Sequence, residues 1–338
     1  MIVNGRFLRA RPTGLHRVGR ALLDAVREAG LSTDVLAPPG VTDPRVDRHV
    51  WAPPGRMGDH VFEQVSLPVA AGRRAILSLT NTGPLLAPHT CVAVHDLAMV
   101  AHPEWYATSM SVYARLVVHA ARRADRVITF SDSVAQELEA VGVRRDNIRV
   151  IREAIDPSFR PADAQAVEQV RKRWALTGPY ALMVGWAHPR KDLATALAAH
   201  RQVVADVPHQ LVLVGGGHVT WAGVPEPHDP TVVRTGHVTD DELLALLTGA
   251  AALLYPSKYE GFGLPPLEAW ACGTPALVSD LPVLRESTED RATFLPLGDT
   301  DVWAEALRSA LAGEVPVPEL PRWSWPDAGR QLLQALPI

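Results

Sequence analysis

Two glutamates eight positions apart, Glu260 and Glu268, flank a glycine-containing turn. The apolar run 252–255 before it has the length of a buried strand, and Pro265 and Pro266 after it suit the first turn of a helix. A phosphate would be bound there by the positive helix end and by four backbone amides, those of Gly261, Phe262, Gly263 and Leu264. Because carboxylates repel phosphate, the two glutamates are better suited to hydroxyl groups of a sugar or ribose.

A basic pair, Arg190 and Lys191, follows a second strand-like run that ends at Gly185. Arginine binds phosphate through two parallel hydrogen bonds and lysine binds it as a point charge, so the pair suits a diphosphate. Only three of the 33 basic residues are lysines, at 172, 191 and 258. A lysine is therefore an unusual choice in this chain, and one of the three stands in this loop.

Histidine and aspartate stand together at the end of a third apolar run, as His95 and Asp96. Asp96 would either orient the imidazole or cap a turn. The glycines of 215–217 form only part of a dinucleotide-binding fingerprint, because Thr220 stands where its third glycine would be. Asp299-Thr-Asp301 has the spacing of a metal-binding Asp-x-Asp, but it opens a helix after a glycine, and a capping role for Asp299 is favoured.

Short apolar runs alternate with stretches of helical period, the pattern of βα units and a parallel sheet. The strands are expected at 1–4, 33–36, 75–79, 92–95, 126–130, 148–151, 181–184, 210–214, 252–255 and 275–278. Helices are expected at 15–29, 133–140, 240–247 and 324–336, among others. The prediction is two doubly wound α/β domains, in which ligands bind beyond the carboxyl ends of the strands.

A proline-rich break at 155–161 marks the link between the two domains. We expect an N-terminal acceptor-binding domain at 1–158, a donor-binding domain at 159–322 and a returning helix at 323–338. The net charge of −4 gives no general attraction to nucleic acid, and the two cysteines show no disulfide or zinc spacing. No run is long and apolar enough to span a bilayer, so a cytoplasmic protein with at most peripheral membrane contact is expected.

The string from Tyr255 to Pro275, with its two glutamates, resembles the donor-site signature of glycosyltransferase family 4. Three further stretches resemble that family in the expected order, around the N-terminal loop, His95-Asp96 and Arg190-Lys191. Asn81-Thr-Gly-Pro84 is similar to its mannosyl- and rhamnosyltransferase-like members. The resemblance implies a GT-B fold of two Rossmann-like domains facing a central cleft, with the C-terminal helix crossing back to the N-terminal domain.

The resemblance also implies roles for individual residues. His95 would contact the transferred sugar, Glu260 its hydroxyls and Glu268 the ribose, with Arg190 and Lys191 on the diphosphate. Further donor contacts would come from Gly14, Gly185 and Gly215, and the acceptor would meet Arg11, His16 and Asp96. Where the family usually has Pro-Asn-Gly-Val-Asp, this chain has Arg152-Glu-Ala-Ile-Asp156.

The expected activity is retaining transfer of a hexose or deoxyhexose from a nucleotide-diphosphate sugar, GDP-mannose first and UDP- or dTDP-sugars next. The acceptor would be a saccharide, lipid-linked or small-molecule hydroxyl, with no metal or other cofactor and a monomer or homodimer as the working form. Six arginines in the first 30 residues would suit a phosphorylated or membrane-borne acceptor, or form an exposed helix face. The alternatives are a sugar-nucleotide 2-epimerase of the same fold and a non-catalytic nucleotide-sugar binding protein.

Overall fold

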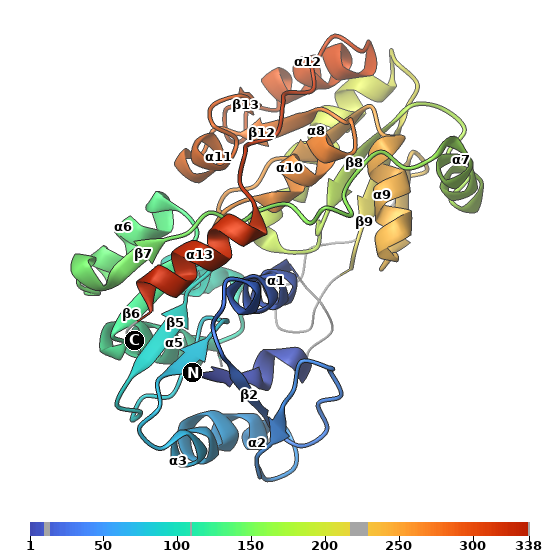
Figure 1. Ribbon diagram of the computed structural model, residues 1–338. Coiled ribbons are helices and arrows are strands. Elements are labelled where there is room, and N and C mark those ends of the chain that lie inside the picture. Colours follow the sequence, from blue (N-terminus) through green and yellow to red (C-terminus); the bar gives the residue numbers. More distant parts are fainter. Residues whose placement is uncertain (10–13, 109, 217–228, 337–338) are drawn as a thin grey trace. The chain divides into compact units, whose positions relative to one another are not determined.

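The structure is a computed structural model that describes residues 1–9, 14–108, 110–216 and 229–336. The chain divides into two compact units (Figure 1). Unit 1 comprises Met1–Ala101, Ser109–Ala154 and Trp323–Ile338, and unit 2 comprises His102–Thr108 and Ile155–Arg322. The chain thus passes from unit 1 to unit 2 after Ala154, whereas the sequence places this boundary at 158. The segment His102–Thr108 belongs to unit 2, although the sequence places it inside the first domain.

Unit 1 is built on a parallel sheet whose seven strands, within the described residues, run in the order β3-β2-β1-β4-β5-β6-β7. The direction of the order reverses at β1, which pairs with both β2 and β4. The loops after β1 and β4 therefore lie at the switch point of the sheet, where doubly wound folds bind ligands. The strands are β1 (Ile2–Asn4), β2 (Asp34–Ala37), β3 (Arg48–His49), β4 (Ile76–Ser78), β5 (Thr90–Ala93), β6 (Arg126–Thr129) and β7 (Ile148–Val150).

Alternating apolar residues of this sheet bury themselves against helices. Ile2, Leu36 and Ile76 share one face and pack with Phe62 and Leu67. At the other end of the sheet, apolar residues of β5 and β6 pack with α5 and α6. The helices of unit 1 are α1 (Gly14–Glu28), α2 (Arg56–Val61), α3 (Leu67–Ala71), α4 (Ala98–Ala101), α5 (Met110–Arg123), α6 (Asp132–Ala140) and α13 (Trp325–Ala335), with a π-helical turn at Phe62–Ser66 between α2 and α3.

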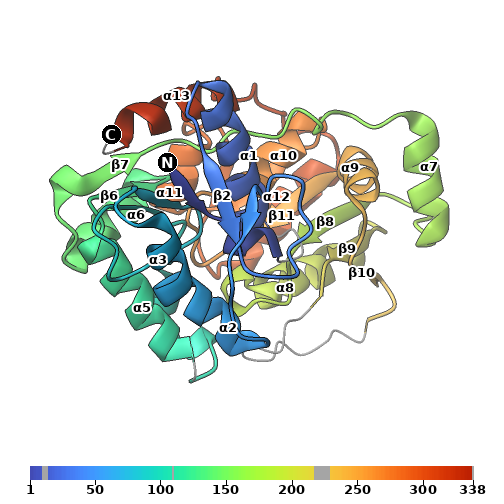
Figure 2. The ribbon, with the colours of Figure 1, turned by 60° about the horizontal axis from the view of Figure 1, so that its bottom comes forward.

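The C-terminal helix α13 lies beside α1 in unit 1 (Figures 1 and 2), as predicted. Their close approach depends on Gly329, because a Cβ atom there would lie 2.3 Å from the carbonyl oxygen of Ala25. This oxygen belongs to the backbone of α1, so it cannot move aside as the end of a flexible side chain could. The last helix therefore joins the first unit through a contact that only glycine permits.

Unit 2 contains a second parallel sheet, whose six strands within the described residues run in the order β10-β9-β8-β11-β12-β13. Trp303 is fully buried and packs with Leu213 and Leu254 in its core. The strands are β8 (Tyr180–Val184), β9 (Gln210–Val214), β10 (Val232–Gly236), β11 (Ala252–Tyr255), β12 (Ala276–Ser279) and β13 (Thr293–Leu295). The helices are α7 (Ala164–Arg173), α8 (Leu193–Val204), α9 (Asp240–Thr248), α10 (Leu264–Ala271), α11 (Pro282–Ser287) and α12 (Thr300–Leu311).

Local signals placed several of these elements correctly. The hydroxyl oxygen of Thr239 accepts from the amide of Glu242, whose carboxylate accepts from the Thr239 amide, so the expected capping box starts α9. Helix α9 lies beside α7 (Figure 2). Three strands were not predicted, β3, β10 and β13, because each lies at a sheet edge and lacks a long apolar run.

The predicted fold class is confirmed, with two doubly wound α/β sheets and a C-terminal helix on the first unit. Among the described residues, no helix has both the length and the apolar composition needed to cross a bilayer. Both cysteines, Cys91 and Cys272, are buried free thiols.

Candidate functional site

The two loops with phosphate-binding chemistry lie side by side in unit 2 because β8 and β11 are neighbours in its parallel sheet. After β8 the chain forms a 3-10 turn, Pro189–Lys191, before α8 begins at Leu193. After β11 it forms the turn that leads into α10. The basic pair thus lies in a turn of its own, immediately before the N-cap of α8.

A buried ion pair joins these two loops. The Lys191 ammonium donates to Oε1 of Glu260 at 2.6 Å and to the hydroxyl of Tyr255 at 2.8 Å. It also lies 4.2 Å from the centroid of the Tyr255 ring, so the aromatic face adds a cation–π contact. The Arg190 guanidinium approaches the other carboxylate oxygen of Glu260 to 3.9 Å. Three predicted donor-site residues therefore form one cluster.

The cluster shifts the pKa values of its members. Burial lowers the pKa of Lys191 to about 8, although Glu260 opposes this shift. Burial by itself would raise the pKa of Glu260, but the charges of Lys191 and then Arg190 outweigh it and lower that pKa to about 2. The carboxylate of Glu260 is therefore charged at neutral pH and acts as a hydrogen-bond acceptor.

The third lysine completes the link between the loops. The Lys258 amide donates to the carbonyl oxygen of Arg190 at 2.7 Å, and its ammonium pairs with Asp192 at 3.0 Å. Asp192 is the N-cap of α8 in a left-handed conformation, with φ of 49°. Lys258 thus stabilises the turn that carries the basic pair.

The turn before α10 has the backbone that the sequence predicted. Gly263 has φ of 95°, and a Cβ atom there would lie 2.5 Å from Cδ2 of Leu284. Only glycine fits both the conformation and the space. Phe262 is buried, and Leu264 begins α10. Glu268 lies one turn further along this helix, where its charge acts on Lys191 and, after burial, helps to raise the pKa of Cys272 to about 11.

Two predicted glycines border the same edge of the sheet. Gly185 follows β8 and its amide donates to the carbonyl oxygen of Val214, while Gly215 follows β9. The indole of Trp186 donates to the carbonyl oxygen of Gly215 at 2.9 Å. The loop after Gly216, including Gly217 and Thr220, lies outside the described residues.

His188 is a site residue whose role the sequence did not reveal. Its Nδ1 accepts from the Arg190 amide at 3.1 Å, so the neutral ring carries its proton on Nε2. Burial, and then the cations of Arg190 and Lys191, lower the pKa of His188 to about 3. A neutral imidazole beside two cations adds a hydrogen-bond donor without adding charge.

An aromatic group from the first half of the chain packs on this histidine. His102 stacks on Trp105 with 3.9 Å between their ring centroids. The rings of Trp105 and Tyr106 lie edge-on to that of His188, with centroid–centroid distances of 6.4 and 5.3 Å. These contacts lie within unit 2, to which His102–Thr108 belongs. The run His102-Pro-Glu-Trp-Tyr106 can be read in the sequence, but its partner in the fold cannot.

His95 lies in unit 1 and is buried. Its Nε2 lies 2.9 Å from the carbonyl oxygen of Leu79, which accepts the proton of that nitrogen, and its backbone amide donates to the side chain of Asn81. Its Nδ1 is 3.6 Å from a carboxylate oxygen of Glu153, which is also buried. The departure from the family pattern at 152–156 thus places a carboxylate against this histidine.

The remaining predicted residues lie in several places. Asp96 accepts from the amide of Ala98 at 3.1 Å, a capping contact at the start of α4. Gly14 begins α1 and His16 lies in its first turn, whereas Arg11 lies outside the described residues. Asp299 accepts from the amide of Val302 and caps α12, as favoured from the sequence.

Residues 178–313 match the family model for glycosyl transferases group 1, and this stretch contains the basic pair, both glutamates and the turn between them. Unit 2 therefore contains the stretch that is similar to group 1 glycosyl transferases. The matched stretch extends from β8 through α12 and includes the whole ion-pair cluster.

Curated proteins named as mannosyltransferases are similar to parts of this chain. The serotype-specific mannosyltransferase WbdA of Escherichia coli is 28% identical over 180 residues, which cover 48% of this chain and 22% of that protein. The O-antigen chain mannosyltransferase RfbU of Salmonella typhimurium is 27% identical over 243 residues, covering 70% of this chain and 65% of that protein. This chain thus spans about a fifth of WbdA and just under two thirds of RfbU.

Solved structures show the same fold. HepE of Anabaena, solved in complex with UDP-glucose, gives a TM-score of 0.69 at 14% identity and covers 98% of this chain and 94% of that chain. The chain has the GT-B fold of such proteins, as the sequence predicted.

Proposed function

We propose that this protein transfers a hexose or deoxyhexose from a nucleotide-diphosphate sugar to an acceptor hydroxyl, with retention of anomeric configuration. The observation that carries the proposal is the cluster of Arg190, Lys191 and Glu260 at adjacent strand ends. It combines cations for a diphosphate with a charged acceptor for sugar hydroxyls. GDP-mannose is the first donor to test, because two relatives named above are mannosyltransferases. UDP- and dTDP-sugars follow, since HepE was solved with UDP-glucose.

The proposed reaction breaks the bond between the anomeric carbon and the diphosphate, so negative charge develops on the leaving group. Arg190, Lys191 and the amides of 261–264 at the start of α10 would stabilise that charge. Glu260 would hold hydroxyls of the transferred sugar, Glu268 those of the ribose, and His95 would contact the sugar. Retention without a nucleophile suits a front-face reaction in which the leaving phosphate takes the acceptor proton.

The test is a thermal-shift screen with GDP-, UDP- and dTDP-sugars, followed by turnover measurements with the donor that binds. A ligand present at 100 times its Kd adds about 2.7 kcal/mol of stability. Product NMR then reports the anomeric configuration, and added EDTA should leave the rate unchanged if no metal is needed. Conversion of the donor to its epimer without acceptor would instead indicate an epimerase.

Substitutions in the cluster should lower turnover. We expect Glu260→Gln and Arg190→Met each to reduce kcat/KM at least tenfold, because one loses a charged acceptor and the other a cation for the diphosphate. Lys172→Met is the matched control, since Lys172 is an exposed cation of unit 2 whose partner is Glu168 on the same helix. Wild-type turnover in both cluster variants would contradict the proposed function.

A further inference from the structure

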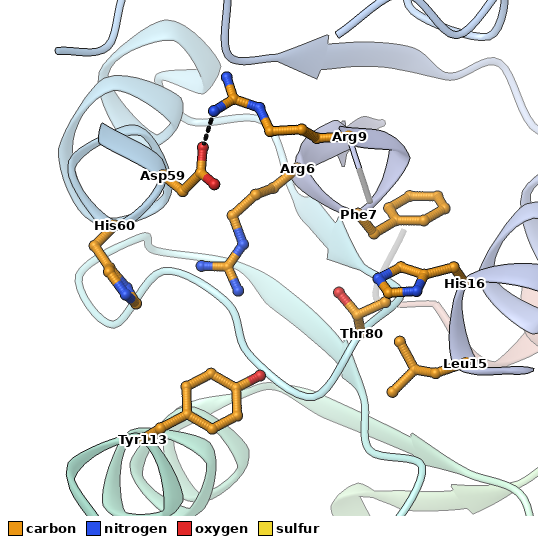
Figure 3. A pocket seen from close by; sticks show the side chains of 9 residues that line it. All are labelled: Arg6, Phe7, Arg9, Leu15, His16, Asp59, His60, Thr80 and Tyr113. Atoms are coloured by element: carbon orange, nitrogen blue, oxygen red, sulfur yellow. Dashed lines mark ion pairs between the residues drawn. The ribbon is translucent and has the colours of Figure 1, made fainter. Parts of the chain in front are cut away.

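A cavity of about 500 Å³ in unit 1 lies where the loops after β1 and β4 meet, at the switch point of the sheet (Figure 3). Arg6, Phe7 and Arg9 enter it from the turn after β1, and Thr80 enters it after β4. Tyr113 closes the opposite wall. Its place in the fold is the one where doubly wound sheets bind ligands, yet the donor chemistry described above lies in the other unit.

The first cation of this cavity is already neutralised by a buried carboxylate. Arg6 donates to Oε2 of Glu63 at 3.0 Å and to the hydroxyl of Thr82 at 3.1 Å. Glu63 lies in the π-helical turn and is 1% exposed, and its other oxygen accepts from Asn4 and Thr82. π-helical turns are frequent at functional sites. The network fixes the Arg6 guanidinium and cancels its charge.

The second cation is also paired with a carboxylate, although both side chains of this pair are partly exposed. Arg9 lies 2.8 Å from Oδ1 of Asp59, and Figure 3 shows this pair on one side of the cavity. His16 adds no charge at neutral pH, because burial, followed by the charges of Arg20, His95 and Arg6, lowers its pKa to about 4. Each arginine in the lining therefore has its own carboxylate, and His16 is a neutral hydrogen-bonding group.

The rest of the lining offers hydroxyls and apolar surface. Burial raises the pKa of Tyr113, so its phenol keeps its proton and can donate a hydrogen bond. Figure 3 shows its hydroxyl pointing toward the space between Arg6 and Thr80. Phe7 and Leu15 supply apolar faces. Hydrogen-bond donors and acceptors beside apolar walls suit a pyranose, because the edges of its ring are polar and its faces are apolar.

From this balance we infer that the cavity receives a neutral, hydroxyl-rich acceptor, a saccharide or polyol without phosphate or carboxylate. The inference rests on the proposed function, in which unit 1 supplies the acceptor site. In this cavity each arginine has a carboxylate of its own, whereas in the cluster of unit 2 two cations share Glu260. A phosphorylated acceptor would therefore meet no net positive charge at Arg6 and Arg9. Arg6 and Arg9 belong to the basic N-terminal stretch that suggested an anionic acceptor. Because both are paired with carboxylates, these two arginines do not favour such an acceptor.

The test measures binding to the full-length protein in the presence of GDP by saturation-transfer NMR. The probes are a panel of neutral methyl pyranosides, including methyl α-D-mannopyranoside, with the 6-phosphate of each. We expect saturable binding of at least one neutral glycoside and at least tenfold weaker binding of its phosphate. Tighter or equal binding of the phosphate, or no saturable binding of any neutral glycoside, overturns the inference.

Asp59→Asn is the decisive variant, because it removes the negative charge paired with Arg9 and keeps a side chain of similar size in the lining. Its preference for the neutral probe should fall to threefold or less. Asp34→Asn is the matched control, since Asp34 pairs with Arg74 at 3.3 Å elsewhere in unit 1, and it should keep the wild-type preference. An unchanged preference in Asp59→Asn counts against the role of the paired charges.

Failure of the inference is distinguishable from failure of the proposed function. Release of nucleotide diphosphate from a donor, measured in the turnover assay described above, reports on the proposed transfer whatever acceptor the cavity of unit 1 binds. Donor turnover without binding of any neutral glycoside would overturn only the acceptor inference. Binding of neutral glycosides by a protein that turns over no donor would overturn the proposed transfer and leave the cavity as a carbohydrate site.

Discussion

At the scale of single residues, the candidate donor site depends on a buried ion pair between side chains that are 69 positions apart. Lys191 and Glu260 are each less than 10% exposed, so neither charge has the solvent as an alternative partner. Removing one member of such a pair leaves the other buried and uncompensated, which costs about 3–5 kcal/mol. The same residues are proposed to meet the donor, so their stability effects and their catalytic effects must be separated.

We therefore predict that Lys191→Met lowers the free energy of unfolding of unit 2 by several kcal/mol, and that adding Glu260→Gln restores part of the loss. The double variant removes both charges, so no buried charge is left without a partner. Urea unfolding of the two single variants and the double variant measures the coupling. Additive losses in the double variant would show that the pair does not stabilise the fold.

At the scale of elements, the close approach of the returning helix α13 to α1 depends on a glycine, Gly329. Alanine favours helices over glycine by about 1 kcal/mol, so propensity alone predicts that Gly329→Ala stabilises α13. The added Cβ would lie 2.3 Å from the carbonyl oxygen of Ala25, and overpacking of this kind costs about 1–3 kcal/mol. Packing should therefore outweigh propensity.

The expected result for Gly329→Ala is a net loss of stability, seen as a lower urea midpoint and as faster proteolysis of the C-terminal helix. Gln331→Ala on the same helix is the matched control, because residue 331 is exposed and its substitution tests propensity alone. A gain of stability in Gly329→Ala similar to that of the control would show that α13 does not need this close approach.

At the scale of the whole molecule, both units bury histidines that resist protonation. Burial lowers the pKa of His16 in unit 1 to about 4, and those of His188 and His200 in unit 2 to about 3 and 4. His200 is fully buried, with Nδ1 2.9 Å from Nε2 of His209. Each ring is neutral in the folded state at a pH where the unfolded chain, with pKa near 6.5, already binds a proton.

This difference predicts a pH dependence with a definite sign. The stability that these histidines contribute is complete above about pH 6.5, and it falls as the pH drops toward about 4, because only the unfolded state gains protons in that window. For His200 alone the loss at pH 5 is about 2 kcal/mol. Urea midpoints at pH 7.5, 6 and 5 should fall in the wild type and fall less steeply in His200→Gln. Equal slopes would contradict the assignment of His200 as a buried neutral base.

The sequence alone determined the local chemistry and the kind of fold. Strand periodicity, the capping box at Thr239 and the glycine-containing turn at 261–264 are short-range signals, because the backbone conformation that each residue type permits is a local property. The tertiary structure decided which loops became neighbours. The order of the strands brings Lys191 into an ion pair with Glu260. In unit 1 the fold brings Glu63 into an ion pair with Arg6 at the cavity. Ion pairs between distant segments depend on that order, and so does the net charge that a ligand meets. For this reason the arginine-rich N-terminus suggested an anionic acceptor, whereas the folded cavity presents arginines whose charges are already balanced.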